Sequence, residues 1–329
     1  MPFTILPMST VSLPVSHEVG GKMRSINPLR DLPRIADLVE LCFHKNMDRE
    51  GQRYVKEMRD ASKSNKFLQW ANSSLPMLGY VWEDGKEIIG NISIVPFRQG
   101  TFLLANIAVH PDYRRQGIAR QLTQQAMQHT RQRGAKEIWL QVEEDNQPAI
   151  QLYRSLGFED QALRSIWNAS TGIAPRTTKD PRISTKTTRF WPQQQNWLDR
   201  SYPEKLRWYR MPDFQVFGPG LKNWLYRIFV ENDIRQWMVQ QDGRVQAILS
   251  WIPSHTRRTQ LWLATAPNAD AQSLAALLLH VRIQLLPRKA ELFLDYPAAQ
   301  HDEAFIKAGF SLQRTLLWMK VSGSVQPDR

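Results

Sequence analysis

The sequence contains little cysteine and no long apolar run. Cys42 is the single cysteine among 329 residues, which excludes an internal disulfide, and we expect it to be a small core residue rather than a nucleophile. No stretch reaches the roughly 18 apolar residues of a membrane-spanning helix. Residues 1–22 carry three prolines and no early positive charge, unlike a secretory signal peptide. We therefore expect a soluble, cytoplasmic protein with a flexible N-terminus at 1–22.

Acidic residues are fewer than basic ones. The 43 lysines and arginines outnumber the 31 aspartates and glutamates, which gives a net charge of +12. Such an excess suits a nucleic acid, a ligand with several phosphates, or a solvated basic face. The sequence shows no recognition helix or RNA-binding signature, so a nucleic-acid partner is the least favoured. Apolar residues make up 42% of the chain, which is enough for ordinary globular cores.

Apolar periodicity predicts an ordered series of elements in the first half of the chain. The series is a strand at 23–29, helices at 30–43 and 52–64, a hairpin at 77–97 turning at Asp84-Gly85, a strand at 102–109, a helix at 118–134, a strand at 136–146 and a helix at 147–158. Antiparallel strands followed by alternating strands and helices predict an α+β fold. Its central sheet is expected to be mixed, mostly antiparallel and flanked by helices.

The second half repeats this order of elements. Asp242-Gly243 stands where Asp84-Gly85 stands in the first half, and Gly309-Phe310 where Gly157-Phe158 stands. An internal duplication is the simplest explanation. The predicted organisation is a flexible N-terminus at 1–22, a domain at 23–167, a basic Thr/Pro-rich linker at 168–190, a second domain at 191–322 and a tail at 323–329. The linker is either a solvated connector or a segment that docks on an acidic ligand or partner.

Residues 110–122, HPDYRRQGIARQL, form a basic turn between a predicted strand and a predicted helix. The first amide N–H groups of a helix have no intrahelical partner, and together with the helix dipole they favour phosphate groups. Gly117 lets the main chain approach a ligand closely, and the small side chain of Ala119 allows a close approach at the next turn of the loop as well. Arg114, Arg115 and Arg120 add positive charge. The turn therefore predicts a phosphate-binding site.

The segment RRQGIA (114–119) resembles the pyrophosphate loop, Arg/Gln-x-x-Gly-x-Gly/Ala, of the GCN5-related N-acetyltransferases, the GNAT family. ANIAVHPDYRRQGIARQL and LQVEEDNQPAIQLYRSLGF resemble the family's two most recognisable segments, in the right order. The close match covers about 105–158, the order of elements extends it to 23–167, and the repeat is similar to that of two-domain members. The resemblance implies the GNAT (acyl-CoA N-acyltransferase) fold, duplicated, with acetyl-CoA as cosubstrate.

The resemblance also implies which residues hold acetyl-CoA. The strand backbone that pairs with the pantetheine arm maps onto Ile107, Ala108 and Val109. The pyrophosphate loop maps onto Arg114, Arg115, Gln116, Gly117, Ile118 and Ala119. Asn146 matches an asparagine that contacts the cofactor arm, and Tyr153 matches the tyrosine that protonates the departing CoA thiolate. No metal site is expected.

Acetyl transfer to an amine needs an oxyanion donor, an acid and a base. The Val109 amide is a candidate oxyanion donor and Tyr153 a candidate acid, although Tyr153 could instead be an aromatic packed on a helix face. The base is open. The ribosomal-protein N-terminal acetyltransferases carry a glutamate at the position of Gln141, which cannot accept a proton. Glu143 is the candidate here, with Glu144, His110 or a base acting through water as alternatives.

The second half lacks these groups. Its counterpart of 114–119 is DAQSLA (270–275), so Asp270 stands for Arg114 and Ser273 for Gly117, while Phe305 takes the position of Tyr153. A negative charge and a missing acid predict a degenerate GNAT-like half that covers or lines the acceptor cleft. The aromatic and basic stretch at 190–210 is either part of that cleft or a surface helix packed by its tryptophans.

The sequence thus predicts an acetyl-CoA-dependent N-acyltransferase. Its N-terminal domain would transfer acetyl to a primary amine by direct attack in a ternary complex, and its C-terminal domain would shape the acceptor site. A small-molecule amine is favoured as the acceptor over a protein N-terminus or a lysine side chain. The chain is expected to be a monomer or homodimer and to have no membrane partner. The alternative, suggested by Gln141, is a noncatalytic acyl-CoA-binding or regulatory protein.

Overall fold

The computed structural model describes residues 20–44, 47, 49–60, 78–170, 180–220, 234–252, 258–286 and 291–323. Most of the predicted flexible N-terminus, the middle of the predicted linker and residues 324–329 lie outside this set. The fold has two compact units, which are described separately. The first takes its described residues from Met1–His44, Gln52–Ser93 and Asn106–Ala126, and the second from Lys45–Gly51, Ile94–Ala105 and Met127–Arg329.

Short strands and an amphipathic helix begin the first unit. β1 (Lys22–Ser25) pairs antiparallel with β2 (Leu78–Asp84), and β3 (Glu87–Pro96) follows β2. The predicted strand at 23–29 ends early because Pro28 starts α1 (Pro28–Phe43), and proline is favoured in the first turn of a helix. The turn between β2 and β3 lies at Gly85 and Lys86, one residue later than predicted. α2 (Arg49–Asp60) and α4 (Ile118–Gln132) also contribute to this unit.

An ion-pair network joins β1, β2 and α1. The Arg24 guanidinium bonds Asp31 Oδ2 at 2.6 Å and Glu83 Oε2 at 2.8 Å, and Arg30 and Arg34 also reach Glu83. Asp31 is fully buried and accepts a bond from the Asn27 N–H as well. The hydrogen bond from Arg24 lowers the pKa of Glu83 to about 2. The start of α1 is thereby fixed to the sheet by charge as well as by its apolar face.

The second unit is built on a long mixed sheet. Its strands lie in the order β4-β5-β12-β6-β11-β10-β9-β8-β7. The pairs β4–β5 and β10–β11 are parallel, while the other neighbouring strands in this order are antiparallel. The strands are β4 (Thr101–Val109), β5 (Glu137–Glu143), β6 (Glu159–Ser170), β7 (Ile183–Thr185), β8 (Arg235–Gln241), β9 (Arg244–Trp251), β10 (Arg258–Thr265), β11 (Glu291–Pro297) and β12 (Ser311–Ser322). The predicted α+β class with a mixed, mostly antiparallel sheet is confirmed.

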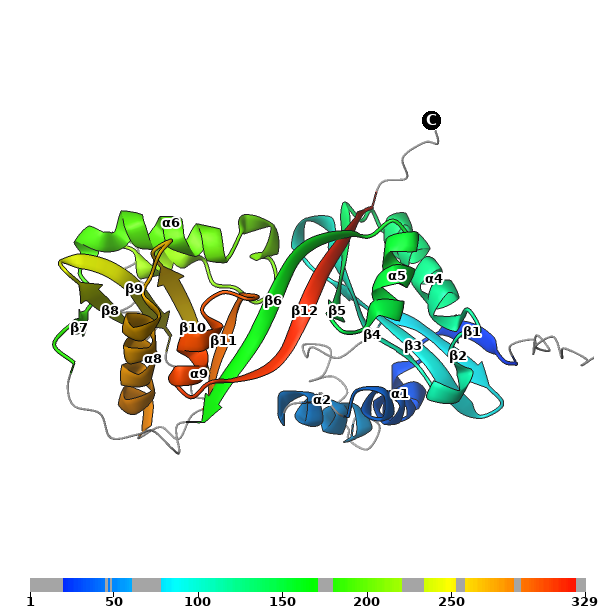
Figure 1. The fold of residues 1–329 in the computed structure, drawn as a ribbon. Coiled ribbons are helices and arrows are strands. Elements are labelled where there is room, and N and C mark those ends of the chain that lie inside the picture. Colours follow the sequence, from blue (N-terminus) through cyan, green and yellow to red (C-terminus); the bar gives the residue numbers. More distant parts are fainter. Residues whose placement is uncertain are drawn as a thin grey trace, which may run out of the picture. The chain divides into compact units, whose positions relative to one another are not determined.

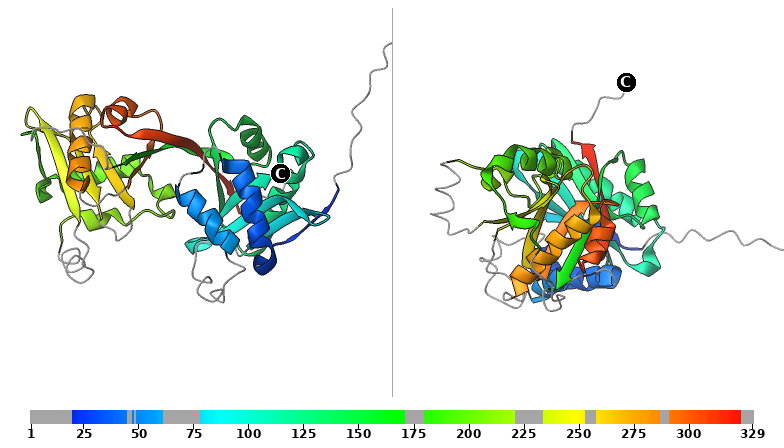
Figure 2. Two further views of the ribbon diagram at one scale, coloured as in Figure 1. Left: turned by 90° about the horizontal axis from the view of Figure 1, so that it is seen from below. Right: turned by 60° about the vertical axis from the view of Figure 1, so that its left-hand side comes forward.

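Helices cover both faces of the strands from the C-terminal half. α6 (Trp191–Ser201) lies on one side of β8–β11, while α8 (Ala271–Leu285) and α9 (Asp302–Lys307) lie together on the other (Figures 1 and 2). α5 (Gln147–Ser155) follows β5. Short 3-10 turns occur at Arg98–Gly100, Pro111–Tyr113, Thr188–Phe190, Glu204–Leu206 and Phe214–Phe217. None of the described helices is long and apolar enough to cross a membrane.

The last strand of each half is exchanged. β12 inserts beside β5, with Trp318 opposite Gln141, and β6 lies beside β11, with Ile166 opposite Asp295. Figure 1 shows β6 and β12 as two long adjacent strands. Each half therefore completes the other's sheet. The sequence patterns predicted neither of these strands.

The internal repeat is visible in the hydrogen-bond registers. The parallel ladder from Thr101–Glu137 to Leu104–Leu140 has its counterpart from Arg258–Glu291 to Leu261–Leu294. After each final helix the chain makes the same turn: the Phe158 N–H donates to Tyr153 O at 3.0 Å, and the Phe310 N–H to Phe305 O at 2.9 Å. The second turn places Phe305 where the first has Tyr153.

Candidate active site

The loop between β4 and α4 has a backbone shape suited to an anion. Arg115 and Gly117 both adopt left-handed conformations, with φ of +66° and +82°, immediately before α4 begins at Ile118. A Cβ added at Gly117 would have the Gln121 Nε2 atom as its nearest neighbour, 3.8 Å away, so the space over this residue is open. The amide N–H groups at the start of α4 have no intrahelical acceptors. A phosphate can therefore approach the main chain closely here.

Packing fixes the start of α4. Ile118 is buried, and its side chain lies against Gly90 of β3, where a Cβ would come within 2.8 Å of the Ile118 Cγ2 atom. Leu122, one turn later, is also fully buried beside Gly90. The absence of a side chain at position 90 thus lets α4 lie close to the sheet. Because the start of α4 is fixed by this contact, the loop before it is also held in place.

The end of β4 directs one amide away from β3. The His110 N–H donates to Ile89 O of β3 at 2.8 Å. Successive N–H groups along a strand point to opposite edges, so the Val109 N–H points away from β3. The Val109 N–H is therefore not directed at β3.

The Val109 carbonyl already has two donors. Cys42 Sγ of α1 lies 3.4 Å from it and Arg114 Nε 3.2 Å from it. Burial raises the pKa of the Cys42 thiol, which therefore stays protonated and serves as a donor. The Cys42 side chain is half-buried rather than a full core residue. Arg114, which we predict to contact pyrophosphate, donates from its Nε to this carbonyl.

The other predicted residues lie on β5 and α5 in the second unit. Tyr153 is 5% exposed, and burial raises its pKa, so its phenol keeps its proton at neutral pH. That is the state a general acid needs. Asn146 caps α5 by accepting a bond from the Ala149 N–H at 3.3 Å. Glu143 is half-buried at the end of β5 and pairs in register with Leu316 of β12.

The structure thus groups the predicted residues in two sets. Ile107, Ala108 and Val109 lie with the loop Arg114–Ala119 in the first unit, and Glu143, Asn146 and Tyr153 lie in the second. Their assigned roles remain predictions.

An aromatic cluster lies on the sheet face that carries Gln141 and Glu143. The β5 residues Trp139, Gln141 and Glu143 alternate onto one face, and Trp318 of β12 lies opposite Gln141. Trp208 lies over this face, with its ring centroid 5.6 Å from that of Trp139 and 5.8 Å from that of Trp318. Phe97 and Tyr209 complete the cluster. Part of the stretch 190–210 therefore packs beside β5, and α6 supplies the expected helix.

One comparison with known proteins covers the loop and its flanking elements. Residues 34–158 match the model of the acetyltransferase (GNAT) family. Residues 34–158 of this chain are thus similar to the GNAT family. The match includes the loop Arg114–Ala119 and α5, and it confirms the family that the sequence motifs indicated.

Relatives with assigned activities match parts of this chain. The [ribosomal protein bS18]-alanine N-acetyltransferase of Escherichia coli K12 is 38% identical over 89 residues, which are 27% of this chain and 59% of that protein. A mycothiol acetyltransferase of Saccharomonospora viridis is 47% identical over 154 residues, 43% of this chain and 46% of that protein. The chain thus spans about 59% of the length of the first of these relatives.

The fold of the whole chain is also that of a solved GNAT structure. The crystal structure of a GCN5-related N-acetyltransferase from Sphaerobacter thermophilus superposes with a TM-score of 0.59 and 14% identity, covering 97% of this chain and 99% of that one. This likeness extends over both halves and confirms the predicted GNAT fold.

The second half of the chain fills its corresponding turn with its own side chains. Asp270 caps α8 by accepting a bond from the Ser273 N–H at 2.7 Å, and this bond lowers the pKa of Asp270. The Ser273 hydroxyl donates to Gln241 Oε1 and lies 3.3 Å from an Arg182 nitrogen. A carboxylate thus occupies the start of α8.

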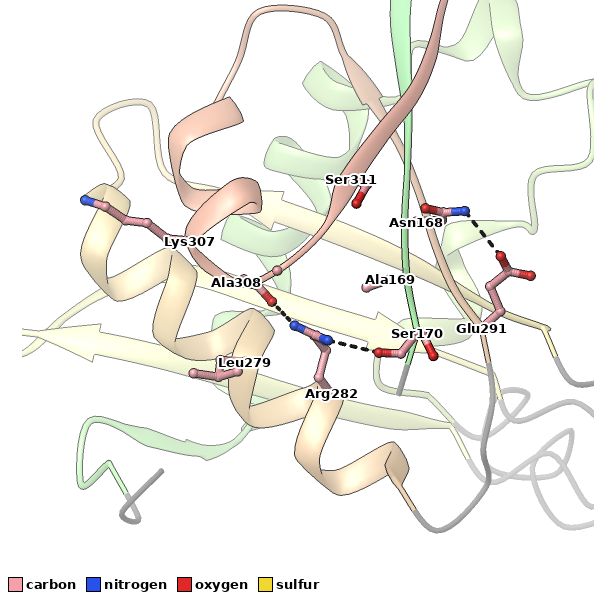
Figure 3. Close-up of a pocket in the computed structure, with 10 residues that line it drawn as sticks. Asn168, Ala169, Ser170, Leu279, Arg282, Glu291, Lys307, Ala308 and Ser311 are labelled. Atoms are coloured by element: carbon pink, nitrogen blue, oxygen red, sulfur yellow. Dashed lines mark hydrogen bonds between the residues drawn. The ribbon is translucent and has the colours of Figure 1, made fainter. Parts of the chain in front are cut away.

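A cavity of about 510 Å³ lies elsewhere in the second half (Figure 3). Its central side chain is Arg282 of α8, which is 5% exposed. The guanidinium donates to the Ala308 carbonyl after α9 and, at 2.9 Å, to the Ser170 carbonyl at the end of β6. Arg282 therefore joins three elements of the GNAT fold, and this cavity contains none of the predicted site residues.

Proposed function

We propose that this chain transfers the acetyl group of acetyl-CoA to a primary amine, with the site formed by the N-terminal half at 23–167. The loop Arg114–Ala119 carries this proposal, because its left-handed Arg115 and Gly117 present open main chain at the start of α4. Acetyl-CoA would place its pyrophosphate on this loop and its pantetheine arm along Ile107, Ala108 and Val109. Asn146 would contact the same arm.

The reaction we infer is direct attack in a ternary complex. The amine nitrogen bonds to the acetyl carbonyl carbon, the Val109 N–H donates to the oxyanion, and the carbon–sulfur bond then breaks. Tyr153 gives its phenolic proton to the CoA thiolate and regains one from solvent. The phenol holds its proton at neutral pH, which this role requires.

The amine must lose a proton, and Glu143 is the proposed base, directly or through water. Glu143 shares the sheet face with Gln141, whose amide cannot take a proton. The rival function, acyl-CoA binding without transfer, rests on this glutamine. It predicts a bound acetyl-CoA that is never consumed.

The C-terminal half, 191–322, is proposed to shape the acceptor site. Trp318 of β12 lies opposite Gln141, and Trp208 packs on Trp139, so two segments from this half border the face that carries Glu143. The carboxylate cap of Asp270 and the phenyl ring of Phe305 support a half without its own acetyl-CoA site. A small-molecule amine remains the proposed acceptor, and the relatives named for a ribosomal-protein alanine and for mycothiol define the two classes to compare.

The test is CoA release from acetyl-CoA with a panel of small amines and of peptides with free N-termini. We expect turnover with at least one small amine. Tyr153→Phe should lower kcat by about 10²-fold while leaving acetyl-CoA affinity unchanged, because only the acid is lost. Phe158→Leu, a change in the ring that neighbours Tyr153, serves as a packing control. Acetyl-CoA binding with no turnover over the whole panel would favour the noncatalytic alternative.

A further inference from the structure

Asn106 interrupts the regular backbone of β4. Its φ is +51°, a left-handed conformation inside a strand that otherwise runs from Thr101 to Val109. The parallel ladder between β4 and β5 reaches Leu104–Leu140, two residues before this point. A single left-handed residue in a strand bends it and re-aims the residues that follow. The next three residues are Ile107, Ala108 and Val109.

A polar network holds Asn106 in this conformation. Its carbonyl accepts a bond from Asn91 Nδ2 at 2.8 Å. Its own Nδ2 donates to the Tyr54 hydroxyl at 2.9 Å and to Ser93 Oγ at 3.3 Å. The three partners come from β3 and α2, so both backbone and side chain of Asn106 are tied to neighbouring elements.

Two members of this network lie in the protein interior. Asn91 and Ser93 are both fully buried. Asn91 Nδ2 is committed to Asn106 and lies 3.4 Å from Ser93 Oγ, while Asn91 Oδ1 has no hydrogen-bond partner among the described residues. A buried acceptor without a partner destabilises a fold. The orientation of Asn91 thus serves the Asn106 carbonyl and leaves its own oxygen unsatisfied.

We propose that Asn106 is a positioning residue for acetyl transfer: the network of Asn91, Ser93 and Tyr54 fixes its left-handed backbone, which sets the direction of the Val109 N–H. This inference rests on the proposed function. It also gives α2 a role in positioning, because Tyr54 of α2 helps to hold Asn106, although α2 carries no predicted site residue. The left-handed turn, rather than the amide group itself, is the feature that acetyl-CoA requires.

Substitutions at position 106 separate the turn from the side chain. Asn106→Gly keeps access to positive φ, whereas Asn106→Ala penalises it because the left-handed conformation places Cβ against the following carbonyl. We expect Asn106→Ala to raise the calorimetric Kd for acetyl-CoA about tenfold and Asn106→Gly to stay within about threefold of the wild type. Asn168→Ala, the same change on β6, is the matched control and should bind like the wild type.

Tyr54→Phe tests the same network without touching the strand. It removes one hydroxyl and keeps the ring, so it remains informative if Asn106→Ala does not fold. We expect a Kd for acetyl-CoA about threefold above the wild type. Melting temperatures are measured alongside, because a purely structural role would lower the melting temperature and leave the Kd of the folded protein unchanged.

The outcomes are distinguishable. The inference is supported if Asn106→Ala binds acetyl-CoA more weakly than the wild type and Asn106→Gly binds it about as tightly as the wild type. Equal binding by the wild type, Asn106→Ala and Tyr54→Phe overturns it and leaves the proposed function intact. No acetyl-CoA binding by the wild type overturns the proposed function and this inference together.

Discussion

Arg164 is a buried charge at the junction of the exchanged strands. Its side chain is 2% exposed, and Nε lies 2.6 Å from Asp295 Oδ1 of β11. The same guanidinium donates to the carbonyls of Ser201 at 2.8 Å and Asp295 at 3.0 Å, and it lies over the Tyr202 ring. β6 is thereby tied to both β11 and the end of α6.

Replacing Arg164 with methionine keeps an unbranched side chain and removes the charge. The substitution leaves the Asp295 carboxylate without its cation and removes one donor from each of two carbonyls. Breaking a buried pair in this way costs about 3–5 kcal/mol. Because the Asp295 side chain is 23% exposed, water can partly replace the arginine, and we expect a loss of about 3 kcal/mol in the free energy of unfolding. Urea unfolding followed by tryptophan fluorescence measures this loss.

A double variant and the pH dependence sharpen this prediction. Arg164→Met with Asp295→Leu should recover to within about 1 kcal/mol of the wild type, since an apolar pair of similar volume replaces both charges. Burial raises the pKa of Asp295, and Arg164 opposes this shift. A carboxyl whose folded pKa is raised is stabilising below its unfolded pKa, about 3.9, and loses that contribution as pH rises. The deficit of Arg164→Met should therefore shrink as pH falls from 7 toward 4. A deficit under about 1 kcal/mol at pH 7, or no recovery in the double variant, would refute the reasoning.

Two further predictions follow from the sheet and its ion pairs. Because Arg24 lowers the pKa of Glu83 to about 2, Glu83 stabilises the fold above its unfolded pKa, and this contribution should be lost as pH falls from about 4.5 to 2. Melting temperatures measured across this range should fall more steeply for the wild type than for Glu83→Gln, and parallel curves would contradict the assignment. A chain ending at Phe310 lacks β12 and leaves the β5 edge and the Trp139 cluster uncovered. It should aggregate in size-exclusion chromatography while a chain ending at Gly323 does not, and a monomeric, folded shorter chain would show that β12 is dispensable.

The sequence predicted the elements whose signals are local. The start of α4 at Ile118 was predicted from the glycine-containing turn before it, and the hairpin of β8 (Arg235–Gln241) and β9 (Arg244–Trp251) turns at Asp242 and Gly243 as expected, with both residues at positive φ. The family followed from two motifs that occur in one continuous stretch. Such features depend on residues a few positions apart, so a linear pattern contains them.

Features that depend on distant partners were not predicted. β12 inserts between β5 and β6, and no local pattern in 311–322 specifies either neighbour. The left-handed Asn106 lies within an apolar run that reads as a regular strand, and only its bonds to Asn91 and Tyr54 explain its backbone. A polar residue in the middle of an apolar strand was the one available signal. Arg114 turns toward the Val109 carbonyl for a similar reason, since its acceptor is set by the tertiary fold.

The central claim is that the loop before α4 holds acetyl-CoA, and calorimetric titration of the full chain tests it most directly. Gly117→Glu places a negative charge and a strained backbone at the proposed pyrophosphate position. Gly134→Glu is the matched control, because Gly134 has a similar φ of +78° and no atom within 4 Å of an added Cβ. We predict one acetyl-CoA site per chain, kept in Gly134→Glu and lost in Gly117→Glu. Binding that survives Gly117→Glu, or no binding by the wild type, would contradict the account.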